Sequence, residues 1–140
     1  MYMKIRDVAE CIIYTPDGGI LLQKKTEDYP VLPGGYWCLF GGVIEPGEKP
    51  EQTIKRELFE ELGIEIDNFS LFLKRDFSLS DGIKGKDYIF KVLFSRDISD
   101  IKLSEGAGFA IFTEREFSSV KIAPTNKKPI QDFFKENKKE

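Results

Sequence analysis

Three carboxylates stand close together near the middle of the chain and could carry out chemistry. Glu57, Glu60 and Glu61 are spaced at i, i+3 and i+4, so on a helix they would fall within one arc of about 100°. Two interpretations are open at this point. An acidic helix face is commonly just solvated. Three neighbouring carboxylates that repel one another also suit a hard divalent cation such as Mg²⁺, which prefers oxygen ligands.

The residues that precede these carboxylates favour the second interpretation. Gly41-Gly42 and Pro46-Gly47 predict a tight, glycine-bearing turn that enters the N-terminus of a helix. Such loops present backbone N–H groups and carbonyls to phosphate and metal. A phosphate-binding loop beside a helix that carries carboxylates indicates metal-assisted phosphoryl chemistry.

The helix that must position the carboxylates is well marked in the sequence. Pro50 suits the first turn, because its missing N–H would have no intrahelical partner there, and Gly63 is a good left-handed terminator. Between them, Ile54, Leu58 and Leu62 recur at i, i+4 and i+8 and predict the buried stripe. The carboxylate arc is displaced from this stripe, so we expect it to face a cleft.

Apolar segments on both sides of the helix predict a β-sheet. We expect strands at residues 8–14, from residue 20, at 36–40 (ended by Gly41-Gly42), at 69–77, at 88–94 (after a turn at 80–86) and at 108–112. Thr113 is expected to cap a short helix through Phe117, and a last helix is expected to begin at Thr125 or Asn126. This order predicts an α+β fold in one domain over residues 1–140, an α/β/α sandwich with a mixed β-sheet flanked by helices.

The composition excludes several function classes. A net charge of −3 argues against a generic basic footprint for nucleic acid, and no apolar run approaches the length that spans a bilayer. Histidine is absent, which excludes Ser-His-Asp catalysis and His-ligated zinc. The N-terminus does not read as a signal peptide. Cys11 and Cys38 are expected to be buried, reduced thiols, which indicates a cytoplasmic location.

The segment from residue 42 to residue 64 resembles a complete Nudix box. In that box, a glycine is separated by five residues from a Glu, and a further seven residues separate this Glu from Arg-Glu and an aliphatic residue. After one more residue comes Glu-Glu, and after another one come a glycine and an aliphatic residue. The matching positions are Gly42, Glu48, Arg56, Glu57, Leu58, Glu60, Glu61, Gly63 and Ile64. No position departs from the pattern, and the whole chain resembles a small Nudix hydrolase of the MutT type.

The resemblance implies hydrolysis of a nucleoside diphosphate linked to another group, with water attacking phosphorus in the presence of Mg²⁺ or, as a substitute, Mn²⁺. It assigns Glu57 and Glu60 as catalytic carboxylates, supported by Arg56 and Glu48, and leaves open which carboxylate is the general base. The implied metal ligands are the Gly41 carbonyl and the carboxylates of Glu57, Glu60 and Glu61.

The resemblance also narrows the substrate. No proline occurs between Pro50 and Pro124, unlike in the ADP-ribose-specific members, which favours a (d)NTP cleaved to NMP and pyrophosphate. The alternatives are ADP-ribose, nucleotide sugars or another nucleoside-diphosphate compound, and, in another class, a nucleotide sensor without catalysis. Asn126 follows Pro124 in a setting where MutT-type enzymes have a base-reading asparagine. Its amide would suit a purine edge, or it is simply a helix N-cap.

Four further residues are candidate substrate contacts. The rings of Phe40 and Trp37 could stack on a base or belong to the core. Lys24 could contact phosphates or end a strand in solvent, and Glu105 could add a carboxylate to the site or be an ordinary loop acid. The expected partner is a small-molecule nucleotide, with neither a nucleic acid polymer nor a membrane, and the protein is expected to be a monomer or a homodimer.

Overall fold

The computed structural model describes residues 6–25, 35–78, 82, 84–102 and 108–137. Within these ranges, strands and helices follow the predicted order. The elements are β1 (Val8–Tyr14), β2 (Ile20–Lys24), β3 (Trp37–Cys38), β4 (Phe40–Val43), α1 (Pro50–Leu62), β5 (Ser70–Ser78), β6 (Lys84–Leu93), a short 3₁₀ turn (Ile98–Asp100), β7 (Gly108–Phe112), α2 (Glu114–Phe117) and α3 (Pro124–Asn137).

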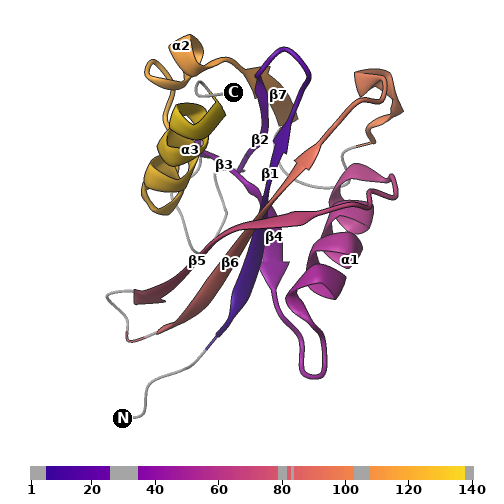
Figure 1. Ribbon diagram of the computed structural model, residues 1–140, viewed down its shortest axis with the longest axis vertical. Coiled ribbons are helices and arrows are strands. Elements are labelled where there is room, and N and C mark those ends of the chain that lie inside the picture. Colours follow the sequence, from indigo (N-terminus) through magenta and orange to yellow (C-terminus); the bar gives the residue numbers. More distant parts are fainter. Residues whose placement is uncertain (1–5, 26–34, 79–81, 83, 103–107, 138–140) are drawn as a thin grey trace.

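The strands form one mixed sheet in the order β3-β2-β1-β6-β5, with β4 paired to β1 and β7 paired to β2. The pair β1–β6 is parallel, and the other pairs are antiparallel. Helix α1 covers one face of the sheet, while α2 and α3 lie on the other side (Figure 1). The predicted sandwich is therefore confirmed. No helix within the described ranges is long and apolar enough to cross a membrane.

Two apolar layers hold the helices to the sheet. One lies under α1, where Ile54, Leu58 and Leu62 are all fully buried, as the helical spacing predicted. The other lies under α3 and contains Ile130 and Phe133. Helix α1 ends at the expected glycine, because Gly63 adopts a φ of 72° and closes the last turn on the Phe59 carbonyl.

The strand predicted at residues 36–40 is broken, and this correction matters for the site. Trp37–Cys38 pairs with β2, whereas Phe40–Val43 pairs with β1, so the chain changes partner at Leu39. The Leu39 N–H donates to Asn126 Oδ1 at 3.0 Å instead of joining a strand. The glycines do not end the strand as predicted, because Gly41 and Gly42 continue it along β1.

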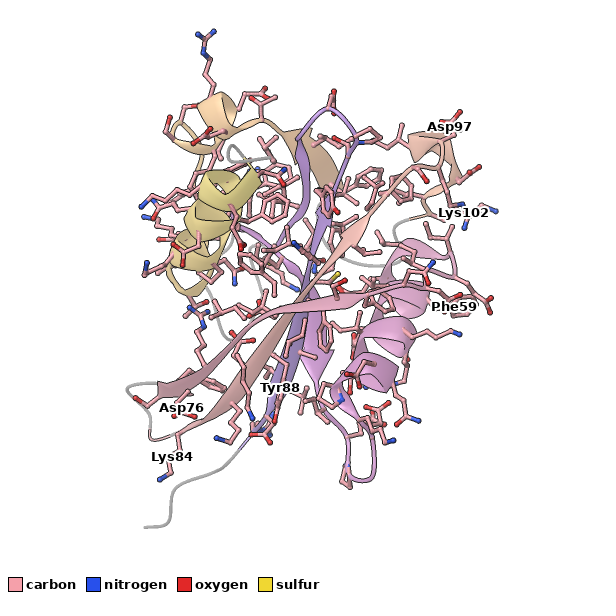
Figure 2. The ribbon with its side chains drawn as sticks, viewed as in Figure 1. Phe59, Asp76, Lys84, Tyr88, Asp97 and Lys102 are labelled. Atoms are coloured by element: carbon pink, nitrogen blue, oxygen red, sulfur yellow. The ribbon has the colours of Figure 1, made fainter. Side chains whose placement is uncertain are left out.

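Other boundaries also differ from the prediction, most of them by one residue. Strand β6 begins at Lys84, inside the predicted 80–86 turn, because β5 and the segment before β1 both supply partners there: Arg6 N–H donates to the Lys84 carbonyl and Asp7 accepts from the Lys86 N–H. Helix α3 begins at Pro124 rather than at Thr125 or Asn126. Figure 2 shows Asp76 and Lys84 at the end of the β5–β6 hairpin that lies far from Phe59 of α1.

The close approach of β4 to β1 gives a prediction about folding. Gly41 has a φ of 152°, and a Cβ there would lie 2.2 Å from the Ala9 carbonyl oxygen. We expect Gly41→Ala to lower the free energy of unfolding by at least about 3 kcal/mol, measured by urea denaturation, because backbone must move. The matched control is Gly47→Ala, whose φ is 84° with nothing within 4 Å, and which should lose only about 1–2 kcal/mol. Equal losses would contradict the clash.

Candidate active site

Helix α1 brings two of the predicted carboxylates against the glycines of β4. Glu61 Oε1 accepts a hydrogen bond from the Gly41 N–H at 3.2 Å. The Glu57 carboxylate lies beside Gly42, so that a Cβ at Gly42 would be only 2.4 Å from Glu57 Oε1. Two carboxylates one helical turn apart therefore flank the Gly41–Gly42 backbone, and the absence of side chains on the glycines makes room for them.

The three carboxylates differ strongly in exposure, so the prediction that all of them face a cleft is wrong for Glu61. Glu61 is only 2% exposed, whereas the side chains of Glu57 and Glu60 are 17% and 55% exposed. Burial raises the pKa of Glu61 to about 7; the hydrogen bond from Gln23 Nε2, at 2.9 Å from Glu61 Oε2, opposes this rise, and the nearby charge of Glu57 adds to it.

Arg56 and Glu48 form a two-pronged ion pair at the start of the site. Arg56 Nε lies 2.7 Å from Glu48 Oε2, and Arg56 Nη2 lies 3.0 Å from Glu48 Oε1. Glu48 also accepts hydrogen bonds from Thr53 Oγ1 and from the Glu45 N–H. These interactions, that with Arg56 foremost, lower the pKa of Glu48 to about 2. The loop before α1 is thereby tied to the helix.

The remaining nitrogen of the guanidinium contacts the carboxylates of α1. Arg56 Nη1 lies 2.9 Å from Glu57 Oε1 and 3.4 Å from Glu60 Oε1. Arg56 therefore makes its bidentate contact with Glu48 and reaches Glu57 and Glu60 through the remaining nitrogen. One positive charge among several carboxylates reduces their mutual repulsion, which allows Glu57 to lie close to the backbone of β4.

The donors around Gly41–Gly42 suit a hard cation. In the part of the chain that the structure describes, no three carboxylates converge closely enough to hold a metal ion by themselves. Glu57 and Glu61 nevertheless reach the same short backbone segment. Mg²⁺ takes few protein oxygens and keeps several waters. Two carboxylates and a neighbouring backbone carbonyl are therefore a chemically adequate set.

Asn126 is buried and its amide makes two hydrogen bonds. Its Oδ1 accepts from the Leu39 N–H at 3.0 Å, and its Nδ2 donates to Glu10 Oε2 at 2.9 Å. Because α3 begins at Pro124, Asn126 lies inside the first turn and its side chain bonds away from the helix. The N-cap interpretation is therefore wrong. Asn126 instead fixes the N-terminal turn of α3 to the point at which the chain passes from β3 to β4.

The remaining predicted contacts lie in different surroundings. Phe40 is fully buried under α1, which leaves no face of its ring for a base, so Phe40 belongs to the core. Trp37 is partly buried on the α3 side, with its ring 4.9 Å from that of Phe112. Lys24 pairs with Trp37 across β2 and β3, and its Nζ lies 6.0 Å from the Trp37 ring. Glu105 lies outside the described residues.

Three polar residues near the site were not predicted. Gln23 on β2 donates to Glu61, as described above. On the opposite side of the sheet, Arg75 pairs with buried Asp87 at 3.0 Å, and burial together with the charge of Asp87 raises the pKa of Glu10. The available signal was similar, because Glu10 lies within an apolar strand segment, Gln23 directly follows one and Asp87 directly precedes one.

Burial of Glu61 predicts a pH-dependent stability in the metal-free protein. Its folded pKa of about 7 lies above the ordinary value of 4.5, so the folded state binds more protons between these limits. The free energy of unfolding should therefore fall as pH rises from about 4.5 to 7, by up to about 3 kcal/mol, and then level off. Urea denaturation in EDTA at several pH values would measure this slope.

The control for this prediction is Glu61→Gln, which is neutral at every pH and keeps the shape of the side chain. Its slope should be smaller than that of the wild type, and its stability should exceed that of the wild type at pH 8. Glu10 contributes to the slope in both proteins, because its pKa is also raised. Equal slopes for the two proteins would contradict the assignment to Glu61.

Comparisons with known proteins agree with this geometry. A family model described as the NUDIX domain matches residues 4–133. A curated relative, nucleoside triphosphatase NudI from Escherichia coli O1:K1, is 40% identical over 78 residues, which cover 56% of this chain and 52% of the relative. The chain thus aligns with about half the length of this relative.

Solved structures with the same fold include a MutT protein from Methanosarcina mazei Go1, with a TM-score of 0.78 and 21% identity over 100% of this chain and 99% of that one. The E. coli ORF135 protein gives a TM-score of 0.69 and 27% identity over 87% and 83% of the two chains. With the family model covering nearly all of the sequence and the box residues gathered around Gly41–Gly42, the chain belongs to the Nudix hydrolase family.

Proposed function

We propose that this protein is a Mg²⁺-dependent pyrophosphohydrolase that cleaves a (d)NTP to NMP and pyrophosphate. The single observation that carries the proposal is the placement of Glu57 and Glu61 against the Gly41–Gly42 backbone, with Arg56 held beside Glu57 by Glu48. A solvated acidic face would not need one carboxylate to be buried and hydrogen-bonded to the strand.

The proposed metal ligands are the carboxylates of Glu57 and Glu61 and the carbonyl of Gly41, with Glu60 reached directly or through water. Bound Mg²⁺, or Mn²⁺ in its place, would supply positive charge to the phosphate oxygens. Glu57 or Glu60 would accept the proton of the attacking water. Arg56 would keep Glu57 oriented through the contact at 2.9 Å, and Glu48 would hold Arg56 in turn.

The choice of a triphosphate substrate has two supports. The curated relatives that align over about half of their length carry the name nucleoside triphosphatase, and the downstream sequence has no proline before Pro124. Asn126, Trp37 and Lys24 are the proposed substrate contacts on the α3 side of the sheet. The Asn126 amide keeps one N–H and one lone pair beyond its bonds to Leu39 and Glu10. Because Asn126 is buried, base recognition through it would require neighbouring groups to move.

The proposed role of Glu57 predicts a large effect on turnover. Glu57→Gln removes the negative charge while it keeps the shape, so kcat should fall at least about 100-fold, as is typical when a general base or a metal-binding carboxylate is lost. The matched control is Glu51→Gln, an exposed acid in the first turn of the same helix, which should leave kcat unchanged. Thermal unfolding of both variants checks the fold. Unchanged turnover in Glu57→Gln would contradict the proposed mechanism.

The substrate is tested by measuring phosphate and pyrophosphate release with Mg²⁺ and with EDTA. The panel holds canonical and oxidised (d)NTPs, ADP-ribose, nucleotide sugars and dinucleoside polyphosphates. We expect Mg²⁺-dependent pyrophosphate release from triphosphates and none in EDTA. Cleavage of ADP-ribose or nucleotide sugars instead would keep the catalytic role and overturn the substrate. Nucleotide binding without any cleavage would favour the sensor alternative.

A further inference from the structure

Gln23 is a buried polar side chain that directly follows the apolar, buried residues of β2. Ile20, Leu21 and Leu22 precede it on β2, and Gln23 itself is only 1% exposed. Strand β2 pairs with β3 and β7 at this position, opposite Cys38 and Phe109. An amide is rarely placed in such surroundings unless its hydrogen bonds are needed.

The surroundings determine how the amide is oriented. Nε2 lies 2.9 Å from Glu61 Oε2 and 3.4 Å from the Leu39 carbonyl oxygen. Both neighbours are acceptors, so only the NH₂ group can face them, and the opposite orientation would place oxygen against oxygen. The two N–H groups therefore join a carboxylate of α1 to the residue where the chain passes from β3 to β4.

This orientation leaves the oxygen of the amide without a hydrogen bond in the part of the chain that the structure describes. Among the described residues, Gln23 Oε1 is buried and has no hydrogen-bond partner. An unsatisfied buried polar atom destabilises the fold. The amide is therefore kept at this position by what its N–H groups hold, the Glu61 carboxylate and the Leu39 carbonyl, which suggests that the glutamine serves the site.

We propose that Gln23 is a positioning residue that fixes Glu61 for metal binding. Its N–H group holds Oε2 while the Gly41 N–H holds Oε1, so the plane of the carboxylate is set by two donors from the sheet. Hydrogen bonds of this kind to a metal-binding carboxylate are typically worth about 10- to 100-fold in metal affinity. The inference rests on the proposed function, because it requires that Glu61 binds the metal.

The test is a titration of the metal-free protein with Mn²⁺, in which free Mn²⁺ is followed by electron paramagnetic resonance without any substrate. Gln23→Met keeps the size of the side chain and removes both N–H groups. We expect its Kd for Mn²⁺ to rise about 10- to 100-fold, while a cooperative urea transition shows that the variant still folds. The matched control is Leu22→Met, a buried neighbour that belongs to the α3 layer, which should leave the Kd unchanged.

Glu61→Gln provides the reference for the metal site. If it binds Mn²⁺ as tightly as the wild type, the metal site itself is misassigned and the proposed function loses its basis along with this inference. If Glu61→Gln weakens binding and Gln23→Met does not, only the role of Gln23 is overturned. In the double variant, Gln23→Met should add little to the effect of Glu61→Gln, because both act through one carboxylate.

Activity gives a second readout. In Gln23→Met, the Mg²⁺ concentration for half-maximal hydrolysis should rise in proportion to the Kd, and kcat at saturating Mg²⁺ should stay within about twofold. A fall in kcat at saturating Mg²⁺ with unchanged Mn²⁺ affinity would overturn the inference. Should Gln23→Met fail to fold, the shorter amide of Gln23→Asn replaces it with the same expected rise in Kd. Failure of both to fold would assign Gln23 to the core and overturn the proposal.

Discussion

The site depends on the burial of a carboxylate where a helix meets a strand of two glycines. Glu61 lies under the sheet only because Gly41 offers it an N–H group and Gly42 has no Cβ to collide with the neighbouring Glu57. A side chain at Gly42 would collide with the Glu57 carboxylate of α1, and a side chain at Gly41 would collide with the Ala9 carbonyl of β1. The glycines are therefore required by the approach of Glu57 and by the approach of β1, and not by a turn.

The position of this strand is fixed from both faces of the sheet. On the α1 side, Gln23 contacts Glu61 and the Leu39 carbonyl. On the α3 side, Asn126 binds the Leu39 N–H and Glu10. Leu39 thus gives both of its backbone polar groups to side chains at the point where the chain changes strand partner. These hydrogen bonds come from segments that are distant in the sequence. They hold the Gly41–Gly42 backbone in one place, as the proposed phosphate and metal site requires.

Local patterns in the sequence were enough to predict α1 and its buried face. Pro50, Gly63 and the spacing of three apolar residues act within one helix, so its bounds and its buried stripe follow from the sequence. The break at Leu39 could not be predicted in this way, because it depends on Asn126, which is 87 residues away. The burial of Glu61 could not be predicted for the same reason. Helical spacing gives the relative directions of side chains, but the hydrogen-bond donors that allow this burial come from β2 and β4.

Each face of the sheet has a buried carboxylate that is costly to ionise. Glu61 on one side and Glu10 on the other both have raised pKa values, mainly because they are buried. A protein selected for stability alone would avoid ionisable groups at these positions, since each favours the protonated, uncharged form in a low-dielectric interior. Under the proposed function, a bound cation would compensate this cost at Glu61, because its charge would favour the ionised carboxylate. Metal binding should therefore stabilise the fold most at neutral and higher pH, where the metal-free protein bears the full cost of the buried charge.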